Sequence, residues 1–99
     1  HLAGVVAART TRPVIGIPCD GGPLNGVDAL YSTVQMPGAI PVATVAVGKA
    51  GAKNAAYLAA QIMALSDPEL DLRVKEDRRK ASEAVMVKDA ALQEKLAKL

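Results

Sequence analysis

The chain has 99 residues, enough for one small domain with a thin core. Half of its residues are apolar, but it has no Phe or Trp and only two Tyr, so we expect closely packed small side chains. The formal net charge is +2, and there is neither a basic stripe nor a set of aromatic platforms. This composition argues against a nucleic-acid partner.

The sequence also carries no pattern typical of membrane insertion or secretion. Its longest apolar stretches, residues 37–47 and 50–65, fall short of the roughly 18 to 20 uninterrupted apolar residues of a membrane span. The start lacks the basic residues and apolar run of a signal peptide. A lone cysteine, Cys19, cannot form an intrachain disulfide, and we interpret it as a small apolar residue after a buried strand. We therefore expect a cytoplasmic protein without a membrane segment.

The first part of the chain predicts a helix, a strand and a second helix. Residues 2–8 are small and apolar, which indicates a short buried helix. Residues 13–18 are apolar, β-branched and bounded by prolines, as in a parallel strand covered on both faces. A turn at 20–23 leads into a helix over about 26–34, which ends ahead of Pro37 because the residue before a proline disfavours helical geometry.

The second part predicts a strand and two further helices. The strand covers residues 42–47, and apolar residues at helical spacing place the next helix over 50–65. Asp67 and Pro68 mark another helix start, because Asp caps free N–H groups and Pro at the first position loses no hydrogen bond. The last helix, over 70–99, carries a narrow apolar stripe that indicates docking against another helix or a neighbouring subunit. The stripe consists of Val74, Ala81, Val85, Leu92, Leu96 and Leu99.

This order of elements predicts an α/β fold with parallel strands. Two strands with apolar faces leave open edges, so we expect further strands from upstream of His1 or from another chain. We divide the chain into an α/β part over residues 1–66 and a helical extension over 67–99.

Few residues offer chemistry. His1 is the only histidine, and a terminal imidazole taken alone is weak support for proton transfer. Gly48 and Lys49 precede a helix but lack the spacing of a phosphate loop, so a tight turn is the preferred interpretation over an anion site. Asp28 is interpreted as a helix-capping or ion-paired residue rather than a ligand contact. No zinc set, Ser-His-Asp triad or carboxylate pair is visible, so spacing identifies no reaction.

Three stretches nevertheless resemble the class I N5-carboxyaminoimidazole ribonucleotide mutase family, often called PurE. They are residues 1–8 (HLAGVVAA), 13–18 (PVIGIP) and 24–56, in which the Gln-Met-Pro segment followed by PVATVAVG is the most specific. The resemblance runs to about Asp67 and concerns the C-terminal half of that family.

The resemblance implies a three-layer α/β sandwich of flavodoxin-like type with a central parallel sheet. This chain would supply its C-terminal half plus a long C-terminal helix that reaches over neighbouring subunits of an octamer. The implied reaction belongs to de novo purine biosynthesis. It moves a carboxylate from the exocyclic nitrogen to ring carbon four of an aminoimidazole ribonucleotide, without metal, ATP or organic cofactor.

The resemblance also implies a partial site. His1 and Leu2 would line the ligand pocket, while Gln35, Met36 and Pro37 would form a wall of the nucleotide site near a subunit boundary. The family's phosphate loop and main acid–base histidine have no counterpart in these residues. We therefore expect the catalytic histidine upstream of His1 and no turnover from the chain alone.

Three alternatives stay open at this point. The chain could be a non-catalytic assembly or ligand-binding fragment of the same fold, since the catalytic motifs are missing. It could belong to the related carboxylase class, which uses free carbon dioxide, although the His-Leu motif and the AGAKNAA run favour the mutase class. The third alternative is a generic phosphate-binding α/β module.

Overall fold

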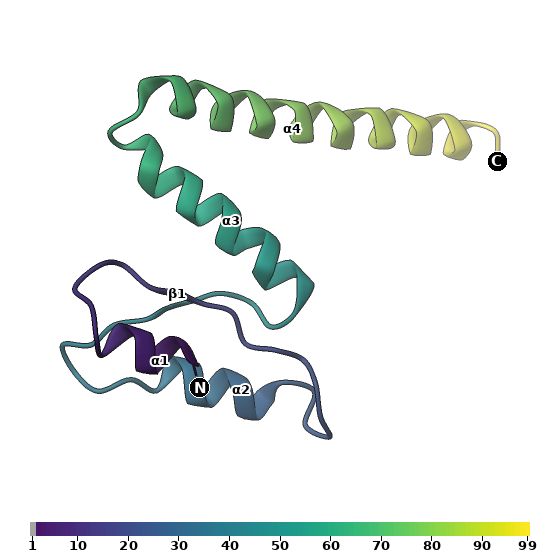
Figure 1. Cartoon of the computed structure of the whole chain (residues 1–99). Helices are drawn as coiled ribbons and strands as arrows, with labels where there is room; N and C mark the ends of the chain where they lie inside the picture. Colours follow the sequence, from purple (N-terminus) through teal and green to yellow (C-terminus); the bar gives the residue numbers. More distant parts are fainter. Residues whose placement is uncertain (1) are drawn as a thin grey trace. The chain divides into compact units, whose positions relative to one another are not determined.

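The computed structural model describes residues 2–99, and Figure 1 traces them from the first helix to the last. The chain order of elements is the predicted one, a small parallel sheet with helices around it and a long helix at the C-terminal end. The elements are α1 (Leu2–Ala7), β1 (Ile15–Gly16), α2 (Val27–Val34), β2 (Ala43–Thr44), α3 (Lys49–Ala64) and α4 (Pro68–Ala97).

The two strands pair in parallel, as predicted, with Ile15 opposite Ala43. Both are shorter than the sequence suggested. Their ladder runs from the Ala43 amide, which donates to the Val14 carbonyl at 2.9 Å, to the Val45 amide, which donates to the Gly16 carbonyl at 3.2 Å. The flanking residues include prolines, which lack the N–H group that a longer ladder needs.

At Gly16, helices α1 and α2 and the residue ahead of β2 come close to β1. A Cβ placed on Gly16 would lie 2.7 Å from Thr33 Cγ2 of α2, 2.8 Å from Val42 Cγ1 and 3.2 Å from Ala3 Cβ of α1. Figure 1 shows α1 and α2 on the same side of the strands. Thr33 is buried here, and its hydroxyl donates to the Ala29 carbonyl at 2.7 Å, so its polar group is satisfied.

Cover on both faces of the first strand, which the sequence predicted, is not found among residues 2–99. Pro18 is fully buried, but Ile17 beside it is 43% exposed. Helices α1 and α2 share one side of the sheet. The buried core is correspondingly thin, as the chain length predicted.

The loop from β1 to α2 requires a left-handed backbone. Gly26, the residue ahead of α2, has φ 89°, and a Cβ there would lie 2.5 Å from Val47 Cγ1 and 2.7 Å from the Cys19 carbonyl oxygen. Only glycine meets both conditions without strain. The turn therefore holds the start of α2 against the residues that follow β1 and β2.

The chain divides into two compact units, one up to Ala59 and one from Ala60 to Leu99, so the division falls within α3. The predicted boundary between residues 66 and 67 separates an α/β part from its extension, and it stays a prediction. No helix among residues 2–99 is both long enough and apolar enough to cross a membrane.

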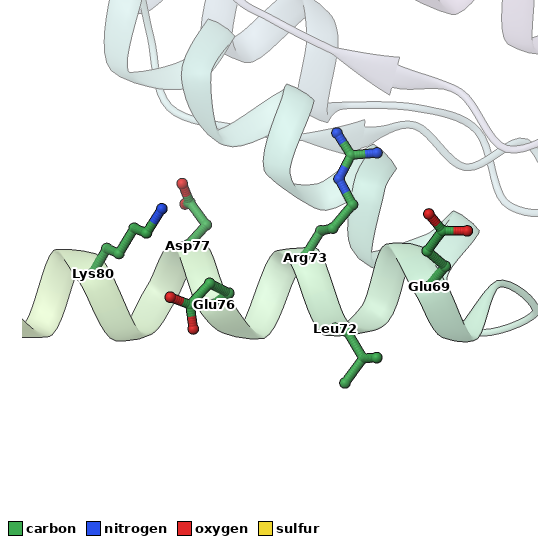
Figure 2. A pocket seen from close by; sticks show the side chains of 6 residues that line it. All are labelled: Glu69, Leu72, Arg73, Glu76, Asp77 and Lys80. Carbon is green, nitrogen blue, oxygen red and sulfur yellow. The ribbon is translucent and has the colours of Figure 1, made fainter.

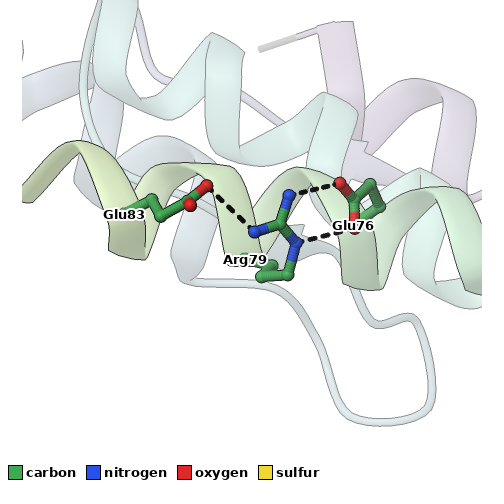
Figure 3. A network of polar contacts seen from close by, with 3 residues as sticks. All are labelled: Glu76, Arg79 and Glu83. Carbon is green, nitrogen blue, oxygen red and sulfur yellow. Dashed lines mark hydrogen bonds and ion pairs between the residues drawn. The ribbon is translucent and has the colours of Figure 1, made fainter.

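Helix α4 begins as predicted and carries its own polar support. The Asp67 carboxylate accepts from the Leu70 amide at 3.1 Å, and Pro68 opens the first turn. Figure 3 shows Arg79 held between Glu76 and Glu83, with N–O distances of 2.7 and 2.9 Å. The hydrogen bond and charge of Arg79 lower the pKa of the Glu76 carboxyl below its ordinary value.

Candidate functional site

An apolar groove of about 580 Å³ lies between α1, β1 and α2. Its polar side chains are Cys19 and Thr33, and the Thr33 hydroxyl is already bonded within α2. The groove is lined by Leu2, Ala3, Val6, Val14, Ile15, Gly16, Ile17, Cys19, Ala29 and Thr33. Apart from these two groups the lining is apolar, so the groove offers mainly an apolar contact surface.

The groove gathers residues at the carboxyl end of β1. Leu2, predicted to line the ligand pocket, is here and is 77% exposed. Cys19 also lies here and is exposed, so it is a wall residue of the groove rather than part of the core; the buried residue of this turn is Pro18. His1, the other predicted pocket residue of this segment, lies outside the described residues. The carboxyl ends of parallel strands are the usual ligand-binding edge of an α/β sheet.

The Gln-Met-Pro segment lies elsewhere. Gln35 ends α2, with its amide donating to the Tyr31 carbonyl at 3.0 Å, and Pro37 accepts from the Ile40 amide at 3.2 Å. Gln35 and Pro37 are exposed, and Met36 is half-buried. Because this segment leads into β2, it lies at the amino end of the strands. The structure therefore does not bring it together with Leu2 inside one chain.

The turn ahead of α3 favours the structural interpretation over an anion site. Gly48 has φ 80°, and its amide donates to the Pro18 carbonyl at 2.9 Å. Asp20 Oδ2 lies 2.8 Å from the position that a Cβ on Gly48 would take. A carboxylate of the chain itself thus stands beside the first turn of α3, where a phosphate would otherwise be attracted to the positive end of the helix.

Asp28 is exposed in the first turn of α2, where a carboxylate favours the helix dipole. This supports its interpretation as a helix-stabilising residue. Sequence reasoning missed Ala29 and Thr33 as groove residues. The available signal was their four-residue spacing, which places both on one face of the predicted helix.

Two further hollows differ in character from the groove. One, of about 390 Å³, lies at the amino end of the strands, where Arg12 is its charged lining residue. The other, of about 400 Å³, follows the first turns of α4 and is lined mainly by charged side chains. In Figure 2, Leu72 points away from Arg73 and Asp77, so this is an open strip on one helix. Among residues 2–99, no three His, Cys, Asp or Glu side chains are grouped to hold a metal ion.

The sequence that forms the apolar groove matches a known family. The family model described as AIR carboxylase covers residues 1–84. The chain belongs to the AIR carboxylase family. All the residues that line the groove, from α1 to α2, lie within the matched range.

Individual members of this family are similar to the chain over most of its length. The N5-carboxyaminoimidazole ribonucleotide mutase of Escherichia coli K12 is 54% identical over 86 residues, which are 87% of this chain and 51% of that protein. The mutase of Bacillus subtilis is 51% identical over 86 residues, which are 87% of this chain and 53% of that protein. The mutase of Thermotoga maritima is 47% identical over 94 residues, which are 95% of this chain and 54% of that protein. The chain thus spans about half the length of the curated relatives it matches.

Proposed function

We propose that this chain forms half of an N5-carboxyaminoimidazole ribonucleotide mutase and takes part in de novo purine biosynthesis. The reaction would move the carboxylate from the exocyclic nitrogen of the substrate to ring carbon four. The observation that carries the proposal is the identity of 47 to 54% with the mutases of three bacteria. The chain covers only about half of these relatives, so the proposal is for half of an active site. Residues equivalent to the other half of the relatives would have to complete it.

The groove suits one step of such a reaction. If the carboxylate leaves as carbon dioxide and is recaptured by the ring carbon, the intermediate must be held close and kept from water. Leu2 and Ile17 offer an apolar wall at the carboxyl end of β1 for that purpose. We assign His1 to the same pocket as a ligand contact, and the main acid–base histidine to the half that the chain does not span. No metal or organic cofactor enters this scheme.

The proposal also covers assembly. A complete protein would be a flavodoxin-like three-layer sandwich with the α/β part at 1–66 and the extension at 67–99, acting as an octamer in the cytoplasm. Gln35, Met36 and Pro37 lie at the amino end of the strands, so we assign them to the nucleotide site of a neighbouring subunit. This assignment explains how the three residues can resemble the family's pocket segment although they share no groove with Leu2 within one chain.

A chimera tests the proposal. The N-terminal half of the E. coli mutase would be joined ahead of His1, and conversion of N5-carboxyaminoimidazole ribonucleotide to the 4-carboxy isomer would be followed without added bicarbonate or ATP. We expect turnover from the chimera and none from the 99 residues alone. A folded chimera that binds substrate but does not convert it would refute the proposal and favour the non-catalytic fragment.

Two matched variants of α1 ask whether the groove is the reacting pocket. Leu2→Glu places a carboxylate at a groove residue that is 77% exposed, so it should abolish turnover of the chimera without unfolding it. Val5→Glu makes the same change on the same helix, at a residue that is 50% exposed and outside the groove lining. We expect Val5→Glu to keep most of the activity. Equal loss in both variants would argue that α1 matters only for folding.

A second candidate activity has its own support, because the matching family model is described as AIR carboxylase. In that case the chimera would carboxylate aminoimidazole ribonucleotide with free carbon dioxide or bicarbonate. Comparing the two substrates in one assay separates the candidates. Conversion of the N5-carboxy compound at low bicarbonate supports the mutase, and activity that requires bicarbonate supports the carboxylase.

A further inference from the structure

The apolar stripe of α4 has a regular spacing. Helix α4 ends at Ala97, so Leu99 lies outside it, and the other five residues of the predicted stripe together with Leu70 are called the stripe from here on. These six residues fall into three pairs whose first residues are 70, 81 and 92, so the pattern repeats every eleven residues. Eleven residues complete about three turns of an α-helix, which keeps all three pairs on one face of a nearly straight helix. The pairs are Leu70 with Val74, Ala81 with Val85, and Leu92 with Leu96.

The opposite face of α4 carries a cluster of charged side chains. At about 100° per residue, Glu76, Arg79 and Glu83 lie on the side away from the stripe, and they bond to one another there. Glu94 and Lys98, 3.4 Å apart, continue this side toward the C-terminal end. These charged groups are therefore paired within the helix, and we take the stripe as the surface that a partner would meet.

The stripe has little cover within the chain. No residue of α4 is buried, and Val85, Leu92 and Leu96 are 65%, 53% and 52% exposed. Leu70 and Val74, at the other end, are half-buried. The family model ends at residue 84, so these three more exposed members lie beyond it.

We propose that α4 pairs with α4 of a second copy of this chain in antiparallel orientation, centred at the level of Glu83. The residue numbers of the stripe are symmetric about 83, so each member meets another member. Leu70 would lie opposite Leu96, Val74 opposite Leu92, and Ala81 opposite Val85. A two-fold contact between identical chains requires this kind of self-complementary surface.

Side-chain size favours the antiparallel orientation over a parallel one. In a parallel pair in register, Ala81 would face Ala81 of the second copy and leave a gap in the middle of the seam. In the antiparallel pair, each Ala81 faces the larger Val85, and both central layers have the same volume. Helices pack closely when a small side chain on one helix faces a larger side chain on the other, so that each layer of the seam is filled.

The charged residues that interrupt the stripe also match in the antiparallel pair. Asp77 and Arg78 of one helix reach the level of Lys88 and Asp89 of the other, because both sets lie five or six residues from Glu83. Residues on the same flank of antiparallel helices meet, which brings Asp77 to Lys88 and Arg78 to Asp89 of the second copy. The seam from Leu70 to Leu96 is about 39 Å long at 1.5 Å per residue. This inference does not depend on the proposed reaction.

Thiol cross-linking tests the pairing and its direction. In a Cys19→Ser background, differently tagged Ala81→Cys and Val85→Cys proteins would be mixed and treated with a short bis-maleimide. Antiparallel pairing predicts cross-links mainly between the two different variants. Cross-links mainly between identical variants would refute the antiparallel arrangement, and none in either mixture would refute the pairing. Ala90→Cys, on the opposite face of α4, is the matched control and should not be linked.

A second pair of variants separates loss of the seam from loss of the helix. Leu92→Glu buries an unpaired charge in the seam and should weaken pairing at least about tenfold, seen as a fall in cross-linking yield. Met86→Glu, at a residue that is 68% exposed on the other face, should leave the yield unchanged. Circular dichroism should show the same helix content in both. Unchanged yield with Leu92→Glu would overturn the proposal.

Discussion

The turn ahead of β2 contains a backbone conformation that does not suit its residue. The Ile40 amide donates to the Pro37 carbonyl at 3.2 Å and closes a turn with Gly38 and Ala39 at its centre. Ala39 has φ 74°, whereas Gly38 is not in the left-handed region. A turn with positive φ at its third residue favours glycine there. The two central residues therefore stand in the less favourable order, and exchanging them should stabilise the fold.

The size of the effect follows from two opposing contributions. A left-handed conformation costs an L-residue about 1 to 2 kcal/mol, and Ala39→Gly would remove this cost. Glycine also gives the unfolded chain more conformational freedom, which lowers the free energy of unfolding by about 0.4 to 1 kcal/mol. The net gain in the free energy of unfolding is about 0.5 to 1 kcal/mol, which raises the Tm of a domain this small by roughly 2 to 8 °C.

Urea unfolding followed by circular dichroism measures the gain, with Gly38→Ala as the matched control. A Cβ on Gly38 would meet nothing within 4 Å, so this substitution should also stabilise, through the unfolded chain alone. The exchanged double variant should show the sum of the two effects, about 1 to 2 kcal/mol. If Ala39→Gly lowers the free energy of unfolding while Gly38→Ala raises it, the assignment of strain to Ala39 is wrong.

Three further predictions test other parts of the fold. Gly51→Ala should destabilise the protein by about 1 to 3 kcal/mol in urea unfolding, because its Cβ would collide with the Ala46 carbonyl; an unchanged midpoint would contradict this packing. Asp67→Ala should cost about 1 kcal/mol and shorten α4 by circular dichroism, while Asp67→Asn should retain most of the cap. The hydrogen bond between Glu76 and Arg79 lowers the pKa of the Glu76 carboxyl from its ordinary value of 4.5 in the folded state. The stability that this bond gives to α4 should therefore be fully present above pH 4.5 and be lost as the pH falls below that value. Helix content should then fall less in acid for Arg79→Gln than for the parent.

Local signals in the sequence were sufficient for the order and type of the elements. The apolar β-branched run around Ile15 and the Asp67-Pro68 start of α4 act within a few residues, so each could be recognised without knowledge of the fold. The strand lengths could not, because a ladder depends on which N–H groups find partners. Prediction from the residues alone also placed cover on both faces of the predicted strand over 13–18, whereas Ile17 is exposed.

The candidate site was harder to predict because it depends on which helices and strands lie next to one another in the fold. Leu2 lines the groove, and its assignment to the ligand pocket by resemblance stays a prediction. Thr33 was missed, since its role follows from the close approach of α2 to Gly16, which no local pattern reveals. The Gln35–Pro37 segment carries a specific sequence match, yet the chain alone gives it no groove in common with Leu2.

The close approach at Gly16 has a consequence for how this protein can change. Two helices and Val42, the residue ahead of β2, all meet where that residue has only hydrogen, within 2.7 to 3.2 Å of the position that a Cβ would take. Enlarging any one of these contacts forces the others apart, so substitutions here would have to occur together.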